Sequence, residues 1–277
     1  MTADFGWGRI ARLGLVQAAL GAVVVLTTST LNRVMVVELA LPALLPGLLV
    51  ALHYAVQLAR PRMGFGSDMG ARRTPWIVGG MAVLASGGWL AAVAVAWMAT
   101  SPAAGIALAM LAFVMVGLGV SAAGTSLLVL LAKRVPEARR AGAATLVWIM
   151  MIVGFAVTAG LAGKLLDPFS PLRLVAVSGG VSLLALLLTL VAVHGVEGQA
   201  RAAAAPAAAE PIGFRDALAQ VWNEPVARRF TVFVFVSMLA FSAQDLILEP
   251  FAGTVYGFSP GQSTQLSGVQ NGGVLAG

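Results

Sequence analysis

Long runs of apolar residues dominate the chain, and short polar segments separate them. Such runs predict transmembrane helices, because about 20 mostly apolar residues are needed to cross a bilayer. Polar Asn32, Arg33 and Glu38, followed by Pro42 and Pro46, predict the turn into the second run, and an eighth run starts near Leu266. The seven complete spans are expected at about 13–31, 44–59, 75–99, 103–132, 141–163, 172–193 and 230–248.

Composition supports a membrane location. Of 277 residues, 59% are hydrophobic and 10% are charged, whereas soluble domains carry roughly 25% charged residues. A mean hydropathy of +0.92 leaves too little polar surface to cover a soluble globule. The chain ends at Gly277 inside an apolar run, so we expect a truncated bundle.

Lysine and arginine are distributed asymmetrically between the two sides of the expected spans. Fourteen of the 17 lie in the N-terminal arm or after spans two, four and six. Because basic loops stay in the cytoplasm, this predicts a multi-pass inner-membrane protein with a cytoplasmic N-terminus. The basic residues form no stripe, so membrane lipid is an expected partner and nucleic acid is not.

An Ala/Pro-rich segment, 199–211, reads as a flexible linker after six spans. We therefore expect a six-helix bundle in residues 1–194, a cytoplasmic linker in 195–228, and the start of a second bundle in 229–277. Four apolar residues of the linker fall on one face of a short helix, namely Phe214, Leu218, Val221 and Trp222. That helix is expected to lie on the membrane surface or to pack on the bundle.

Two carboxylates and an amide stand near the far end of the seventh span. Asp245 and Glu249 are four residues apart, so they share a helical face, and Gln244 precedes them. Charged residues at membrane depth are functional candidates by default, which suggests a contact with a pigment, an ion or a partner. The alternative is that both carboxylates lie in the periplasmic interface and that Pro250 ends the helix.

His53 is a second candidate, inside the second span. An imidazole nitrogen there could ligate a metal or a magnesium-porphyrin centre. The alternative is a histidine that is hydrogen-bonded inside the bundle.

Several enzyme classes are excluded by the sequence. The absence of cysteine removes thiol catalysis, thiolate metal sites and disulfides. Gly257 to Gly261 matches a hydrolase pattern, but Pro260 follows its serine and lacks the N–H that an oxyanion hole needs. That segment is expected to be a turn, and no ATP-binding Gly-rich loop is present.

A glycine-rich basic segment lies in the loop between spans two and three. Gly64 is followed by Asp68, Gly70, Arg72 and Arg73, and the segment resembles the corresponding loop of the major facilitator superfamily. It departs from that pattern at Met69 and in the early position of Gly70. Its glycines suit a tight turn, and Asp68 could cap span three or pair with a basic neighbour. The resemblance implies a loop that latches one conformation; a plain basic loop is the alternative.

Three segments together resemble the PucC/LhaA family, also called the bacteriochlorophyll delivery family. The strongest is the run from Ala243 to Gly253, which contains Gln244, Asp245 and Glu249. The others are 30–39 and 60–76, whose Arg-Pro-Arg sequence, with His53, is closer to the LhaA branch. The resemblance covers the chain and implies a twelve-span major facilitator fold, of which this would be the N-terminal portion.

The resemblance further implies a light-harvesting antenna assembly factor that holds or delivers bacteriochlorophyll to nascent core antenna polypeptides. Antenna polypeptides, the chlorophyll-synthesising enzyme and the insertion machinery would be its partners. The alternative is a secondary transporter of a small solute, which should carry polar residues at mid-membrane. Apart from His53 and Gln57, the first six spans look nearly bare. An enzyme is not expected, because the Asp-rich motifs that bind prenyl diphosphate are missing.

Overall fold

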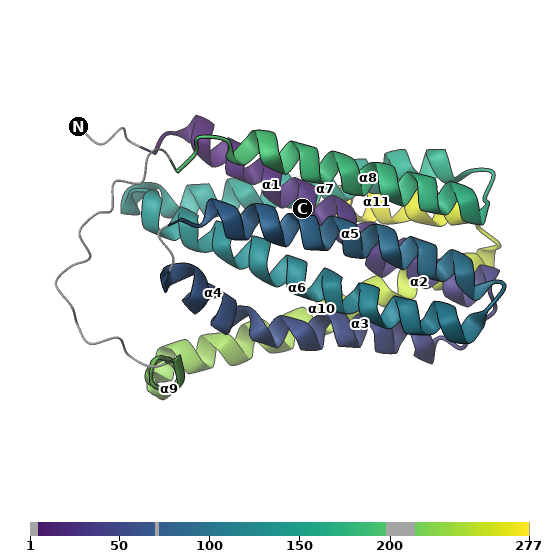
Figure 1. Ribbon diagram of the computed structural model, residues 1–277, viewed down its shortest axis with the longest axis horizontal. Coiled ribbons are helices and arrows are strands. Elements are labelled where there is room, and N and C mark those ends of the chain that lie inside the picture. Colours follow the sequence, from purple (N-terminus) through teal and green to yellow (C-terminus); the bar gives the residue numbers. More distant parts are fainter. Residues whose placement is uncertain (1–4, 70–71, 198–213, 277) are drawn as a thin grey trace.

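The computed structural model describes residues 5–69, 72–197 and 214–276, and every regular element in these ranges is a helix (Figure 1). The helices before the linker are α1 (Trp7–Val25), η1 (Leu26–Thr30), α2 (Leu31–Arg33), η2 (Val34–Glu38), α3 (Leu44–Val56), η3 (Gln57–Ala59), α4 (Arg60–Met69), α5 (Thr74–Met98), α6 (Pro102–Arg134), α7 (Glu137–Leu166) and α8 (Pro171–Val193). After the linker come α9 (Phe214–Asn223), α10 (Pro225–Tyr256) and α11 (Pro260–Ala276).

Within the described residues, five helices are long and apolar enough to cross a membrane. They are Trp7–Glu38, Thr74–Met98, Pro102–Arg134, Glu137–Leu166 and Pro171–Val193. The all-helical architecture agrees with the expectation from the sequence. These five helices correspond to five of the seven complete spans that we expected, and the expected spans at 44–59 and 230–248 are not among them.

The first helix runs without interruption from Trp7 to Glu38, through α1, η1, α2 and η2. The predicted turn at Asn32 and Arg33 is therefore wrong. Both side chains are buried, and they find polar partners inside the protein, so they do not need a loop at the membrane surface.

Two stretches of this helix, η1 and η2, are wound as π-helix. The hydroxyls of Thr27 and Thr28 donate to the carbonyls of Val23 and Val24, four residues back, just where the first π stretch begins. Such bonds compete with the backbone for the same carbonyl oxygens. Short π-helical segments inside α-helices occur frequently at functional sites.

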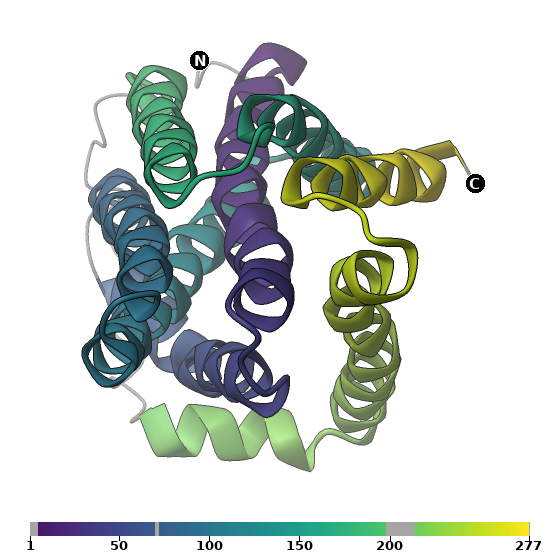
Figure 2. The same ribbon diagram turned by 90° about the vertical axis from the view of Figure 1, so that its right-hand side faces the viewer.

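The first helix occupies the centre of the molecule when the bundle is viewed end-on (Figure 2). Helices α7 and α8 pack directly on α1, α5 packs on both α6 and α8, and α3 packs on α6. One core cluster joins α1 to α5, α6, α7 and α8, with Leu13, Leu84 and Leu127 fully buried in it. The first helix is thus positioned to hold buried polar groups away from lipid.

The glycine-rich segment does not form the expected tight turn at Gly64. It belongs to α4, which continues the helical path of α3 and η3 to Met69. A Cβ on Gly64 would lie 3.1 Å from the Cγ2 of Thr125. This glycine therefore allows close approach between α4 and α6. Gly70 and the side chain of Asp68 lie outside the described residues.

Helix α10 continues through Pro250 to Tyr256, so the alternative in which this proline ends the helix is wrong. The helix ends at Gly257, which has φ +67° and whose N–H bonds to the carbonyl of Ala252. Residues 257–259 then form the expected turn into α11. Proline inside a transmembrane helix is tolerated when neighbouring groups satisfy the freed carbonyl; the carbonyl that Pro250 frees is that of Leu246, four residues earlier, and Asn32 Nδ2 donates to it at 2.8 Å.

Candidate functional site

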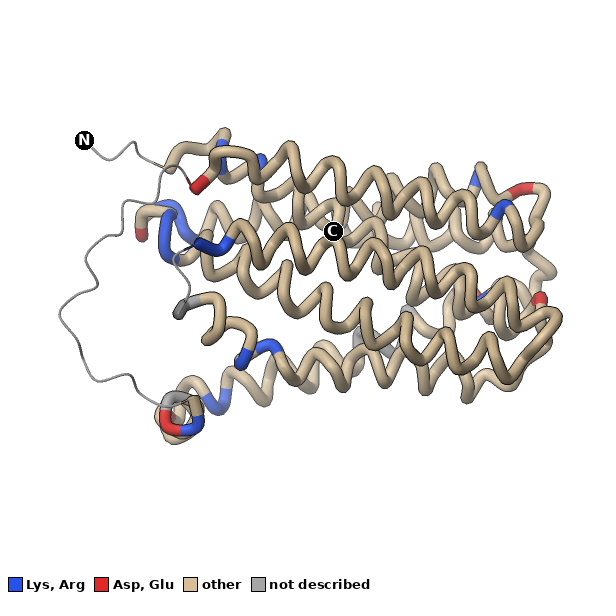
Figure 3. Tube along the Cα trace, viewed as in Figure 1, with Lys and Arg blue, Asp and Glu red and all other residues tan. Residues whose placement is uncertain are grey.

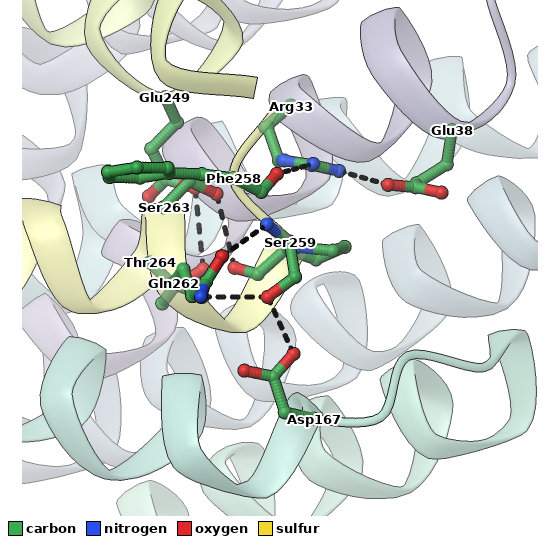
Figure 4. Close-up of polar contacts among 10 residues, drawn as sticks. Arg33, Glu38, Asp167, Glu249, Phe258, Ser259, Gln262, Ser263 and Thr264 are labelled. Carbon is green, nitrogen blue, oxygen red and sulfur yellow. Dashed lines mark hydrogen bonds and ion pairs between the residues drawn. The ribbon is translucent and has the colours of Figure 1, made fainter. Parts of the chain in front are cut away.

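A buried polar cluster lies where the end of the first helix meets α10 and α11 (Figure 4). Its side chains come from segments more than 200 residues apart in the chain. The members with side chains buried in it are Thr30, Asn32, Arg33, Glu249, Ser263, Thr264 and Ser267.

Arg33 is the cation of the cluster and is only 1% exposed. Its Nη1 donates to Glu38 Oε1 at 2.5 Å, and its Nη2 donates to the carbonyl of Phe258. The π-helical winding of η2 brings residues 33 and 38 together, because a π turn pairs residues five apart. Gly253 of α10 leaves room for the guanidinium, since a Cβ there would lie 3.2 Å from Arg33 Nε and Nη2.

Glu249 is the fully buried carboxyl group of the cluster, 0% exposed. Three hydroxyls of α11 donate to its carboxylate: Ser267 at 2.7 Å, Thr264 at 3.3 Å and Ser263 at 3.4 Å. These residues share the face of α11 that is turned toward α10. An ionised carboxylate can only accept hydrogen bonds, and the three hydroxyls supply hydrogen-bond donors that lipid cannot supply.

Direct hydrogen bonds join the first helix to both later helices. Asn32 Nδ2 donates to the carbonyl of Leu246 at 2.8 Å, and the hydroxyls of Thr30 and Thr264 are 3.0 Å apart. Helix α7 is tied in by the carboxylate of Asp167, which follows it and accepts from the Ser259 hydroxyl at 2.7 Å (Figure 4). The cluster therefore connects segments on both sides of the linker.

His53 lies apart from this cluster, on α3 against α6, and is 1% exposed. Its Nε2 is 2.6 Å from Gln57 Nε2, one helical turn later, while Nδ1 has no hydrogen-bond partner among the described residues. One ring nitrogen is thus hydrogen-bonded inside the bundle and the other is buried unpaired in the described part of the chain. The fold does not bring His53 and Glu249 together.

Gln244 and Glu249 also have different environments, because Gln244 is exposed whereas Glu249 is buried. The side chain of Asp245 lies outside the described residues. Of the site residues predicted on this helix, Glu249 therefore lies in the buried cluster and Gln244 lies on the surface.

At the opposite end of the bundle, Glu197 caps α5. Its carboxylate accepts from the backbone N–H groups of Arg73 and Thr74 at 2.8–3.1 Å and from the Thr74 hydroxyl at 2.6 Å. Burial by itself raises the pKa of Glu197, but these hydrogen bonds and the charge of Arg73 outweigh burial, so the pKa lies below its ordinary 4.5. Arg73 of the expected loop motif is thus engaged by a residue that follows α8.

The sequence interpretation missed Arg33, Asn32 and the three hydroxyls of α11 as site residues. Arg33 was assigned to a loop, so the first six spans looked nearly bare. The available sequence signal for Arg33 was its position within a few residues of the Glu38 carboxylate in an apolar run. The three hydroxyl residues of α11 carried no such signal, because serine and threonine are common in transmembrane helices.

Long apolar helices around a buried ionic cluster define this protein as a multi-span helical membrane protein by length and composition. The family model described as PUCC protein matches residues 30–277. The chain belongs to the PUCC family, as its sequence motifs predicted.

Three relatives show the extent of the similarity. The chain is 54% identical over 273 residues to the "Bacteriochlorophyll synthase 44.5 kDa chain" of Rhodobacter capsulatus, covering 98% of this chain and 63% of that protein. It is 32% identical over 295 residues to "Protein PucC" of Rhodovulum sulfidophilum, covering 99% and 63%. It is 33% identical over 277 residues to an uncharacterized protein in the puhA-bchM intergenic region of Rhodobacter capsulatus, covering 94% and 56%. The chain thus spans less than two thirds of the relatives it matches.

In this arrangement, neither His53 nor Glu249 fits as a ligand for the magnesium of bacteriochlorophyll, the pigment that the resemblance implies. A magnesium ligand must face the plane of a large ring, yet His53 is 1% exposed and Glu249 is 0% exposed. Three hydroxyls already donate to the Glu249 carboxylate. Among the predicted ligands with described side chains, Gln244 is the exposed one.

Proposed function

We propose that this protein is an assembly factor for light-harvesting antenna complexes, and that it handles bacteriochlorophyll for nascent core antenna polypeptides. The observation that carries the proposal is membership of the PUCC family, together with 54% identity to a protein named as a bacteriochlorophyll synthase chain. The antenna polypeptides, the chlorophyll-synthesising enzyme and the insertion machinery are the partners of this proposal.

The proposed role is binding rather than catalysis. Attaching a prenyl tail to a chlorophyll requires residues that hold a diphosphate through magnesium, and the sequence lacks the Asp-rich motifs for that task. The name of the relative is therefore taken as support for a pigment-related role alone.

The proposal includes a major facilitator architecture in the inner membrane, with the N-terminus in the cytoplasm. Residues 1–194 are the six-helix half, 195–228 the linker, and 229–277 the start of the second half. Most of the Lys and Arg residues of the described part gather at the end where the N-terminus lies (Figure 3), which supports this orientation.

In this proposal the buried cluster holds the far side of the protein closed. Its hydrogen bonds from Thr30, Asn32 and Arg33 reach α10, α11 and the turn between them. Opening of that side would separate these groups and expose Glu249. Exposed Gln244, on the same helix, is the candidate contact for a pigment or a partner.

A secondary transporter of a small solute is the second candidate. The sequence argument against it was the lack of charged residues in the first six spans, and buried Arg33 removes that argument. A charged site between two halves of a bundle is typical of transporters.

The experiment that separates these two functions is deletion in a phototrophic host, with complementation by the full-length protein. We expect deletion to lower the absorbance of the core antenna, and we expect the purified full-length protein to carry pigment absorbance. Gln244→Ala should lower antenna yield without loss of membrane insertion, whereas Gln220→Ala, an exposed glutamine on α9, serves as the matched control. Normal antenna in the deletion strain and a colourless protein would contradict the proposal and favour the transporter.

A further inference from the structure

A pocket of about 360 Å³ lies at the basic end of the bundle, between the start of α5 and the end of α8. It is distinct from the buried cluster, which lies where the first helix meets α10 and α11. Figure 3 shows that this end of the molecule, near the N-terminus, is rich in basic residues.

The lining of this pocket combines an apolar wall with a set of polar residues, which we call its polar rim. Its apolar wall is made by Pro75 and Val78 of α5 and by Leu190 and Val193 of α8. Arg72 lies at the polar rim, just before α5 begins. The rim also includes His194, Thr74, Gly195 and Glu197. This combination suits a molecule with an anionic head and an apolar chain.

The other arginines and the carboxylate near the rim are already engaged. Arg12 donates to the carbonyls of Val191 and His194, and Arg134 donates to the carbonyl of Glu197. The Glu197 carboxylate accepts from the first N–H groups of α5. The start of α5 is therefore capped by the protein itself, and its N–H groups are not the binding element of this pocket.

Arg72 differs from these neighbours. It is exposed, and among the described residues it has no hydrogen-bond or ion-pair partner, although it lines the pocket. A guanidinium binds phosphate oxygens through two parallel N–H groups. A phosphate is therefore one ligand group that matches Arg72.

We propose that this pocket binds an anionic phospholipid, with the phosphate of the headgroup on Arg72 and an acyl chain along Val78, Leu190 and Val193. Basic pockets between transmembrane helices on the cytoplasmic side are known to bind such headgroups. The apolar wall favours a lipid over free phosphate, because it adds burial of a hydrocarbon chain that inorganic phosphate lacks. This inference is independent of the proposed role in antenna assembly.

The test is lipid retention by the purified full-length protein. Protein in mixed micelles of phosphatidylglycerol or phosphatidylcholine is examined by native mass spectrometry, and its melting temperature is measured with each lipid and with inorganic phosphate. We expect phosphatidylglycerol to be retained preferentially and to raise the melting temperature. Arg72→Gln should weaken this retention by about fivefold, the effect of one basic residue at a membrane surface.

Two further variants keep the result interpretable. Lys164→Gln removes an exposed cation of α7 that does not line this pocket and should leave retention unchanged. Leu190→Trp fills the apolar wall without altering charge and should weaken retention. Because Arg72 has no partner among the described residues, the lipid-free melting temperature of Arg72→Gln should match that of the wild type.

Three results would overturn the inference. The first is equal retention of phosphatidylcholine and phosphatidylglycerol. The second is equal stabilisation by inorganic phosphate, which would indicate an anion site without a lipid chain. The third is loss of retention in Lys164→Gln comparable to that in Arg72→Gln, which would indicate a general effect of surface charge.

Discussion

Arg33 illustrates how a single buried charge is held in a membrane protein. Its guanidinium is 1% exposed and is matched by a carboxylate, Glu38, and by the carbonyl of Phe258. A buried charge is tolerated when it is paired and hydrogen-bonded. The partners come from its own helix and from the turn after α10, so the residue also joins two parts of the chain.

Removing this cation should destabilise the protein. Arg33→Leu leaves the Phe258 carbonyl and Glu38 without their donor, and we expect a loss of about 2–3 kcal/mol in the free energy of unfolding. The double variant Arg33→Leu/Glu38→Leu should recover part of that loss, because no unpaired carboxylate remains. Thermal unfolding in detergent measures the stability of the single variant and of the double variant, with Lys164→Leu, at an exposed position, as the control. Equal melting temperatures for Arg33→Leu and the control would contradict this account of the site.

Gly253 allows helix α10 to approach the guanidinium of Arg33 closely. A Cβ at this position would lie 2.8 Å from Val37 Cγ2 and 3.2 Å from the guanidinium, so Gly253→Ala should cost about 1–3 kcal/mol through overpacking. Gly180→Ala is the matched control, because nothing lies within 4 Å of the Cβ it would add to helix α8. We expect the control to be neutral or stabilising by up to about 1 kcal/mol. Similar melting temperatures for the two alanine variants would show that Gly253 is not tightly packed.

At the scale of elements, α5 begins at a carboxylate supplied from beyond the end of α8. Glu197 accepts three hydrogen bonds from backbone N–H groups and the hydroxyl at this start. A negative charge there also interacts favourably with the helix dipole. The cap thus connects the last helix before the linker to the segment that contains Arg72 and Arg73.

The cap predicts a pH-dependent contribution to stability. The pKa of folded Glu197 is below its ordinary 4.5, so its contribution is present above pH 4.5 and is lost as the pH falls through the folded pKa. Glu197→Gln should lower stability near neutral pH by about 1 kcal/mol. The difference in melting temperature from the wild type should shrink on acidification below pH 4.5. Glu224→Gln, at a helix start where the side chain makes no cap bond, should show no such trend; a parallel trend there would argue against a specific cap.

For the whole molecule, the links between the first helix and α11 define how the later helices sit on the bundle. The hydroxyl oxygens of Thr30 and Thr264 are 3.0 Å apart although the residues are 234 positions apart in the chain. The chain has no cysteine, so a pair introduced at these positions would form a single defined disulfide.

We expect Thr30→Cys/Thr264→Cys to cross-link on oxidation and to raise the melting temperature, because the disulfide closes a long loop. A shift in gel mobility that reductant reverses would report the bond. Thr100→Cys/Ala138→Cys provides the control, because exposed Thr100 lies in the turn before α6 and exposed Ala138 lies in the first turn of α7, beyond the other end of α6; this pair should not cross-link. Failure of the first pair to cross-link would contradict the arrangement of α11 against the first helix.

Some features follow from local sequence and were predictable. The apolar runs at 75–99, 103–132, 141–163 and 172–193 correspond to α5, α6, α7 and α8 within a few residues. They were predictable because the need to bury some 20 apolar residues in lipid is a property of each segment alone. Family membership was also accessible from the motifs around Asn32 and Glu249.

The polar site depended on tertiary structure. From the local sequence, Asn32 and Arg33 looked like loop residues, because polar side chains without a visible partner are expected at the membrane surface. Pro250 looked like a helix end, because proline lacks a backbone N–H. The fold supplies Glu38, Leu246 and Phe258 as partners instead. The contacts of Asn32 with Leu246 and of Arg33 with Phe258 join residues more than 200 positions apart, and no local pattern encodes them, whereas Glu38 lies five residues after Arg33 on the same helix. The sequence by itself determined that the protein is built of long apolar helices, whereas the tertiary structure decided which buried charges meet, since a buried charge is stable only beside its partners.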